Sequence, residues 1–274
     1  MKQIFLLIMA TISINALAKG EVKVSELDNF KLHTYYSNDV MGDASYIVEG
    51  KDGLVVMEAP LFKDGAAEFD AYTATLNKPV VARIADYHIG ATGDNDIIVA
   101  RGMKHEIEHG GYAAMIAGFK QNFGDAMLLP TGRKIEQDFD KDFELAGVTF
   151  HFSHGATTDF PAASVTIGGK VYLTHWAPAK AHMNGLQLPN VAAIDAEIAQ
   201  AKQALAAGCD LYAGCHGGLA TPADMQFKLE YLTTLKQLRA SSATPEAFVA
   251  AVTAAYPSLP GADALPALAT NLYK

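Results

Sequence analysis

Two groups of histidines in this 274-residue sequence have spacings that suit metal chemistry. The first is "HEIEH", in which His105 and His109 would share one face of a helix to hold zinc, with a glutamate as general base. Gly110 and Gly111 follow directly, and a double glycine favours the end of a helix over its continuation. Because no sustained helix is expected there, we predict that His105 and His109 are not metal ligands.

The second group consists of four histidines that each follow an apolar, strand-like segment. They are His88 after "PVVARIA", His154 after "VTFHFS", His175 after "KVYLT" and His216 after "DLYAGC". Four imidazoles just past four strand ends are expected to converge on one edge of a sheet core, where loops on a rigid scaffold form binding sites. Imidazole is also a preferred ligand of zinc. The sequence therefore predicts a metal or polar binding site at this edge.

Strands and helices interleave along the chain, and hairpins dominate each half. Alternating apolar and polar residues predict strands over 22–27 and 30–37, and the lysine, aspartate and glycine at 51–53 mark a hairpin turn. Predicted helices cover 64–76, 112–124, 191–208, 221–238 and 244–257. This order of elements indicates a sheet-on-sheet core with helices outside.

The N-terminus has the pattern of an export signal. A basic second residue precedes an apolar run over 4–14, and Ala-Leu-Ala at 16–18 offers a cleavage site. We therefore expect a signal peptide over 1–18 and a single mature domain over 19–274 that ends in helices. No later segment reaches about 18 consecutive apolar residues, so no stable membrane insertion is expected after cleavage. The expected location is periplasmic or secreted.

Composition and charge limit the partners of the chain. Half of the residues are hydrophobic and 19% are charged, which is ordinary for a soluble globular protein. A formal net charge of −9 argues against nucleic acid and anionic membranes, because phosphates would be repelled. The expected partner is a small molecule. The two cysteines, Cys209 and Cys215, frame the strand-like "DLYAG", which would separate them by about 20 Å, so we expect free, buried thiols.

The order of the segments resembles the metallo-β-lactamase fold superfamily. "ASYIVEGKDGLVVMEAP" is similar to its opening hairpin, whose second strand usually ends in an aspartate where this chain has Glu58. "PVVARIADYHIGATGDN" resembles the strand and loop bearing His-x-His-x-Asp-His-x-Gly-Gly, and "FELAGVTFHFSHGATTD" resembles the strand that leads to a metal-binding histidine, here His154. "KVYLTHW" is similar to the strand ending in Gly-Asp, and "DLYAGCHGG" to the last strand and its Pro-Gly-His-Gly loop, at His216. The resemblance covers 38–238 and implies an α+β fold, a four-layer αββα sandwich.

The loop after "PVVARIA" departs from the family pattern, and two alignments are open. In the first, Asp86 and His88 take the places of the first two histidines, while Gly90 and Ala91 stand where the aspartate and the third histidine should be. In the second, His88 matches the last histidine of the loop, which puts arginine and alanine in the first two places. We adopt the first alignment because it leaves a workable set of ligands.

The resemblance implies one remaining metal site. Family members hold one metal with three histidines and a second with an aspartate, a histidine and a bridging carboxylate, whose place here falls on His175 or its neighbour. The second site is therefore expected to be lost, whereas Asp86, His88 and His154 would still hold one zinc ion. His216 or His175 would add a fourth ligand or assist the bound water as acid or base. The expected metal ligands are Asp86, His88, His154 and His216, and the expected catalytic groups are Asp86, His175 and His216.

Together these features predict an exported, hydrolase-like protein with a mononuclear zinc site that attacks an ester, lactone or amide. The alternative is a non-catalytic binding protein that keeps the scaffold and has lost its metal. Turnover of β-lactams is expected to be weak or absent, because the clamp of a second metal on the leaving group is missing. Cys215, next to His216, is expected to be a buried, inert thiol.

Overall fold

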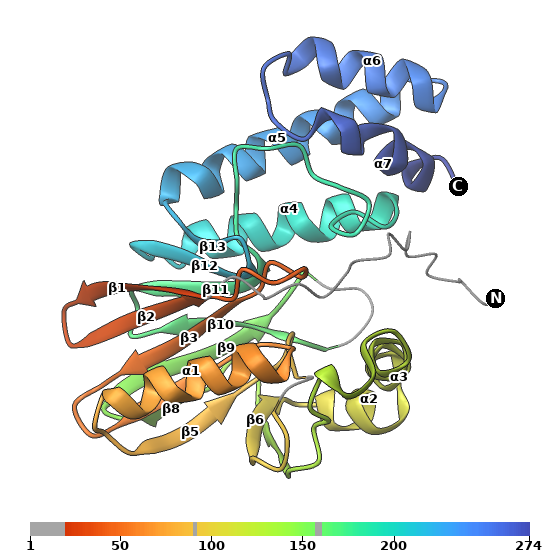
Figure 1. Ribbon diagram of the computed structural model, residues 1–274. Helices are drawn as coiled ribbons and strands as arrows, with labels where there is room; N and C mark the ends of the chain where they lie inside the picture. Colours follow the sequence, from red (N-terminus) through yellow and green to blue (C-terminus); the bar gives the residue numbers. More distant parts are fainter. Residues whose placement is uncertain (1–19, 90–91, 157–160) are drawn as a thin grey trace.

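The computed structural model describes residues 20–89, 92–156 and 161–274. Two β-sheets pack face to face, and helices cover their outer sides (Figure 1). The expected α+β sandwich in four layers is thereby confirmed. The predicted signal peptide over 1–18 and the loop residues Gly90 and Ala91 lie outside the described residues.

Within the described residues, the first sheet has seven strands, ordered β1 to β7. Their bounds are Glu21–Leu27, Phe30–Tyr36, Ala44–Glu49, Leu54–Met57, Val80–Ile84, Ile97–Ala100 and Lys134–Gln137. Strands β1 to β4 pair antiparallel, and β4 to β7 pair parallel. The predicted hairpin between β3 and β4 is confirmed, with the turn at 51–53.

The second sheet, described over the same residues, has six strands in the order β13-β12-β11-β10-β9-β8. From β8 to β13 the bounds are Asp142–Leu145, Val148–His154, Ala163–Ile167, Val171–Trp176, Leu211–His216 and Gly218–Ala220. The neighbours β11 and β12 pair in parallel, so their carboxyl ends lie side by side. This parallel pair carries two of the four strand-end histidines.

Successive side chains along each strand point to opposite faces of its sheet, so each sheet packs on both sides. Side chains from both sheets fill the space between them, among them Leu32, Tyr46, Val48, Phe150, Phe152, Val165 and Leu173. Helix α1 (Lys63–Thr75) places Phe69 on the outer face of the first sheet, against Leu54 and Val56. Helix α4 (Val191–Ala206) covers the outer face of the second sheet through Ala201 and Ala204. Burial of these apolar faces is the main force that holds the layers together.

Five further helices complete the described part of the chain. They are α2 (Met103–His109), α3 (Gly111–Phe123), α5 (Pro222–Ser241), α6 (Pro245–Ala255) and α7 (Leu265–Leu272), with short 3₁₀ turns at Gly124–Ala126 and Ala262–Ala264. Helices α5 to α7 form an apolar cluster with α4 (Figure 1). Thr221 begins α5, and its side chain and that of Asp224 form a capping box. None of the described helices combines the length and hydropathy that a bilayer span requires.

Three local features differ from the sequence prediction. Strand β5 is mostly apolar, yet Val80 and Val81 are exposed, because the apolar cluster beneath α1 does not include them. Helix α2 forms over the "HEIEH" segment, where no sustained helix is expected, and strand β7 is not predicted by the sequence. Both are short, and short elements acquire most of their stability from tertiary packing that local sequence does not reveal.

Candidate metal centre

Three histidines meet where the carboxyl ends of strands from both sheets come together. His175 and His216 belong to the parallel strands β11 and β12 of the second sheet. His88 comes from the loop after β5, in the first sheet. One ring nitrogen from each of the three lies within 4.8 Å of the others, which is close enough to share a metal ion. The convergence of strand-end histidines that the sequence predicts is present for these three.

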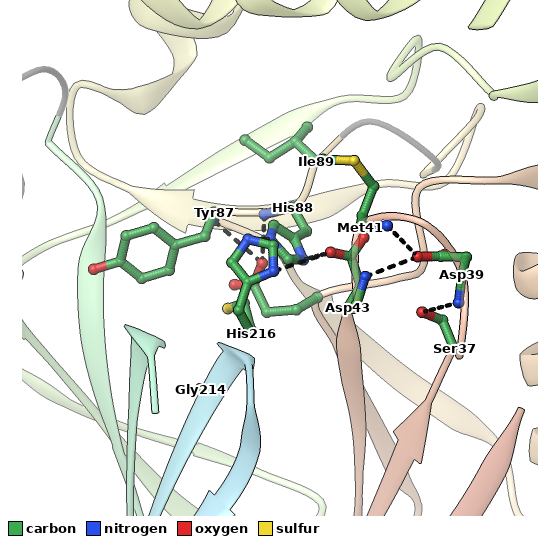
Figure 2. Close-up of polar contacts among 12 residues, drawn as sticks. Ser37, Asp39, Met41, Asp43, Tyr87, His88, Ile89, Gly214 and His216 are labelled. Atoms are coloured by element: carbon green, nitrogen blue, oxygen red, sulfur yellow. Dashed lines mark hydrogen bonds and ion pairs between the residues drawn. The ribbon is translucent and has the colours of Figure 1, made fainter. Parts of the chain in front are cut away.

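The ring nitrogens of His88 and His216 have the spacing of two ligands on one ion (Figure 2). Their Nε2 atoms are 3.2 Å apart. Two nitrogens bound tetrahedrally to zinc, each at 2.0–2.1 Å, lie about 3.3 Å from each other. Without a metal, the same distance suits an N–H···N hydrogen bond between neutral rings. Burial lowers the pKa of His88 and of His216 to about 4, so both rings are neutral at pH 7 and able to bind a metal.

A buried aspartate, Asp43, faces the other nitrogens of these two rings. Its Oδ1 atom lies 3.3 Å from His216 Nδ1 and 3.9 Å from His88 Nδ1. Both imidazoles therefore turn Nδ1 toward one carboxylate and Nε2 toward each other (Figure 2). Carboxylates in this position fix the tautomer and orientation of metal-binding histidines. Sequence reasoning missed Asp43, because it precedes β3 without a motif and meets His216 only through an isolated bridge between the two sheets.

Glu58 fixes the loop that carries His88. Its carboxylate accepts hydrogen bonds from the backbone N–H groups of Asp86 (3.0 Å), Tyr87 (3.2 Å) and His88 (2.7 Å). Glu58 itself is fully buried and has a left-handed backbone, with φ of 53°. Burial raises the pKa of Glu58 to about 7, and the three N–H donors oppose that rise. Glu58, which stands where the resemblance places an aspartate, thus holds the backbone of the candidate ligand His88.

Two aromatic rings limit the rotation of the imidazoles on the second sheet. Tyr87 is buried and stacks on His175, with ring centroids 4.7 Å apart and an interplanar angle of 5°. Trp176 stacks on His216 at 4.2 Å and 27°. Burial, together with repulsion from His88 and His216, lowers the pKa of His175 well below its usual value. All three imidazoles are therefore neutral and held in place, as metal ligands must be.

No protein-family model and no curated protein matches the sequence. Solved structures do match. The stereoselective inverting sec-alkylsulfatase Pisa1 from Pseudomonas sp. is 16% identical with a TM-score of 0.56, over 88% of this chain and 47% of that one. A metallo-β-lactamase family protein from Thermus thermophilus is 12% identical with a TM-score of 0.52, over 84% of this chain and 87% of that one. The chain has the metallo-β-lactamase fold.

A third solved structure agrees with this fold. A variant of the flavo di-iron protein from Thermotoga maritima is 9% identical with a TM-score of 0.52, over 80% of this chain and 63% of that one. This chain spans about half the length of the alkylsulfatase and less than two thirds of the flavo di-iron protein. The resemblance drawn from sequence motifs is confirmed for the fold, and such low identities carry over no residue role.

Asp86 and His154 lie outside the group that the three histidines form. Asp86 is fully buried and accepts a hydrogen bond from the Ala100 backbone N–H at 2.6 Å, and burial raises its pKa well above the usual range. It connects the loop after β5 to β6. His154 is exposed at the end of β9 and stacks on Phe139, with centroids 3.8 Å apart. Of the expected ligands, the structure brings His88 and His216 together, adds His175 to them, and places Asp86 and His154 outside this group.

The "HEIEH" segment forms helix α2, which ends at His109 because Gly110 has an extended backbone. The His109 side chain is 70% exposed. Within the described residues, neither His105 nor His109 belongs to a group of three potential ligands. The helix thus ends at the double glycine, as the sequence predicts.

Changing both His105 and His109 to alanine is therefore expected to leave zinc content and any hydrolysis within about twofold of the unmodified protein, because neither ring takes part in the site. Zinc per chain and kcat/KM, measured side by side, check this. If this double variant lost zinc, His105 and His109 would be metal ligands and the prediction would be wrong.

Cys215 is buried next to His216, and its thiol lies 3.6 Å from the Thr174 carbonyl oxygen. Burial raises the pKa of the Cys215 thiol well above its usual value. Cys209 is also free and buried. The prediction of two free, buried thiols is confirmed, and the neutral Cys215 thiol is inert as a nucleophile.

The shared carboxylate gives a further prediction. Asp43→Asn removes the carboxyl group that faces His88 and His216 but keeps the size of the side chain. Zinc affinity is expected to fall about 10- to 100-fold, as for other carboxylates behind metal-binding histidines. Competition with a chromophoric chelator measures it. Asp96→Asn, which removes an exposed carboxylate that pairs with Arg133, serves as the control and should leave zinc affinity unchanged.

Proposed function

We propose that this chain is a hydrolase-like protein that uses one zinc ion held by His88, His175 and His216. The observation that carries the proposal is the shared orientation of two rings, with Nδ1 facing Asp43 and the Nε2 atoms 3.2 Å apart. Three neutral imidazoles form a known catalytic zinc set with an open fourth position. A second metal has no ligand set of its own among the described residues, which supports a mononuclear site.

The chemistry of the donor set fits the metal. His88 Nδ1 and Asp43 Oδ1 are buried, and the described part of the chain gives neither a hydrogen bond. With a cation at Nε2, each Nδ1–H would become a stronger donor toward the carboxylate that it faces. A zinc ion in such a site supplies Lewis acidity and lowers the pKa of a coordinated water toward about 7.

The residues of the chain then have distinct tasks. Glu58 holds the loop that presents His88, and Asp43 lies where it would favour a proton on His216 Nδ1 once a cation occupies Nε2. Tyr87 and Trp176 keep the rings of His175 and His216 from turning. The side chains of His88 and His216 are 11% and 14% exposed, so part of each ring is open to solvent. The proposed substrate is an ester, lactone or amide, and the proposed location is the periplasm or the medium.

Zinc stoichiometry of the purified protein after exhaustive dialysis tests this proposal. One equivalent per chain, together with hydrolysis of a panel of neutral esters, lactones and amides, is the expected result. A secondary alkyl sulfate belongs in the panel because a sec-alkylsulfatase shares the fold. Two tightly bound equivalents would refute the mononuclear site. Absence of zinc even when it is supplied in excess would favour a non-catalytic binding protein on the same scaffold.

A further inference from the structure

Trp176, the single tryptophan of the chain, lies at the carboxyl end of β11 beside the candidate metal centre. In the parallel pairing of β11 with β12 it is the partner of His216, and the two rings stack at 4.2 Å. Its indole is also near the ring of His175, at 5.1 Å. The side chain is half-buried, so a part of it that His216 does not cover reaches solvent.

The position of Trp176 is not explained by core packing. None of the apolar clusters formed by the described residues includes it. Its ring contacts among those residues are with His175 and His216, both candidate ligands. A large aromatic side chain is expected to bury most of its surface in a core unless it has a partner outside it. The accessible part of Trp176 therefore offers a flat apolar surface at the edge of the candidate metal centre.

Charges near the centre select against anionic substrates. Asp39 and Asp43 both lie close enough to His216 to act on its charge. Lys228 acts on His175, but it is buried and paired with Glu197 at 2.7 Å. The chain as a whole carries a net charge of −9. Apart from the metal itself, an anionic substrate would find no unpaired cation among these side chains and would meet the negative field of the chain around it.

We propose that Trp176 is the specificity-determining residue of this site and selects neutral esters that carry an aromatic ring next to the scissile bond. The inference rests on the proposed hydrolase function and names its substrate class. A substrate ring that stacks on the open part of the indole would place its ester at the histidines. The attraction is specific to aromatic rings, because their quadrupoles favour offset or edge contacts that a saturated ring of similar size cannot make.

The test compares benzyl acetate with cyclohexylmethyl acetate, which have leaving alcohols of similar acidity and similar size. The zinc-loaded protein is expected to prefer benzyl acetate by about threefold to tenfold in kcat/KM. Trp176→Leu should remove this preference, measured as the ratio of the two kcat/KM values in protein that holds one equivalent of zinc, and Trp176→Phe should retain most of it. The anionic 4-(acetoxymethyl)benzoate should be the poorest of the three substrates. An equal preference in Trp176→Leu and in the unmodified protein would overturn the inference.

Tryptophan fluorescence separates this inference from the proposed hydrolysis. Because Trp176 is the single tryptophan, benzyl alcohol should change the emission in a saturable way, and cyclohexylmethanol should change it less. A selective response without hydrolysis of any ester would support the inference and refute the proposed function. Hydrolysis without aromatic preference, together with no response to benzyl alcohol, would overturn the inference alone. No hydrolysis and no response would overturn both.

Discussion

Replacing His88 by alanine is expected to strip the protein of zinc and abolish hydrolysis. The change leaves two of the three imidazoles that meet in the candidate metal centre. Loss of a carboxylate behind a metal-binding histidine already costs about 10- to 100-fold in affinity, so loss of a ligand should cost more than about 100-fold. Zinc per chain after dialysis and competition with a chelator of known affinity measure the effect.

His154→Ala is the matched control for His88→Ala. His154 also follows a strand and is expected from sequence to be a ligand, but its ring is exposed and stacks on Phe139. Its removal should leave zinc affinity within about twofold, since surface substitutions away from a site have small effects. The opposite pattern, with zinc lost in His154→Ala and kept in His88→Ala, would restore the ligand set inferred from sequence.

Glu58→Ala is expected to have the largest effect on stability. The variant removes the acceptor of three buried backbone N–H groups, those of Asp86, Tyr87 and His88. Each buried donor left without a partner costs about 1–3 kcal/mol, and water that enters the space recovers part of this. We expect the free energy of unfolding to fall by about 3–5 kcal/mol, and zinc affinity to fall with it because His88 loses its fixed position. Urea denaturation of the metal-free protein and zinc titration of the folded variant separate the two effects.

Glu136→Ala serves as the control for Glu58→Ala. The Glu136 carboxylate also accepts a backbone hydrogen bond, from Gly102 N–H at 2.7 Å, but this contact is exposed to solvent. Water replaces the lost acceptor there, so the free energy of unfolding should fall by less than about 1 kcal/mol. If the two variants lost equal stability, Glu58 would have no special part in holding the His88 loop.

Local patterns predicted most of the architecture. Alternation marks β1 and β2, the turn at 51–53 marks the hairpin of β3 and β4, and Thr221 marks the start of α5. Each of these signals comes from residues close in sequence, because strand period, turn geometry and helix capping are local properties of the backbone. The same locality made the end of α2 at the double glycine predictable.

The site was predictable only in part. Histidines after strands indicated the correct edge, because the carboxyl ends of neighbouring parallel strands must lie together. Which of them meet depends on where each side chain points, and the sequence does not fix that direction at an irregular strand end. His154 therefore lies outside the group that His175 joins, and Asp86 faces β6 instead of the histidines.

The contacts that make the site specific come from tertiary structure alone. The parallel register of β11 and β12 sets Trp176 beside His216, and an isolated bridge between the sheets brings Asp43 to the same imidazole. These residues are far apart in the chain and share no motif. The sequence by itself determined the elements and the edge at which the histidines gather. Only the packing of the two sheets decided which carboxylate orients them and which aromatic ring lies at their side, because both depend on long-range pairing.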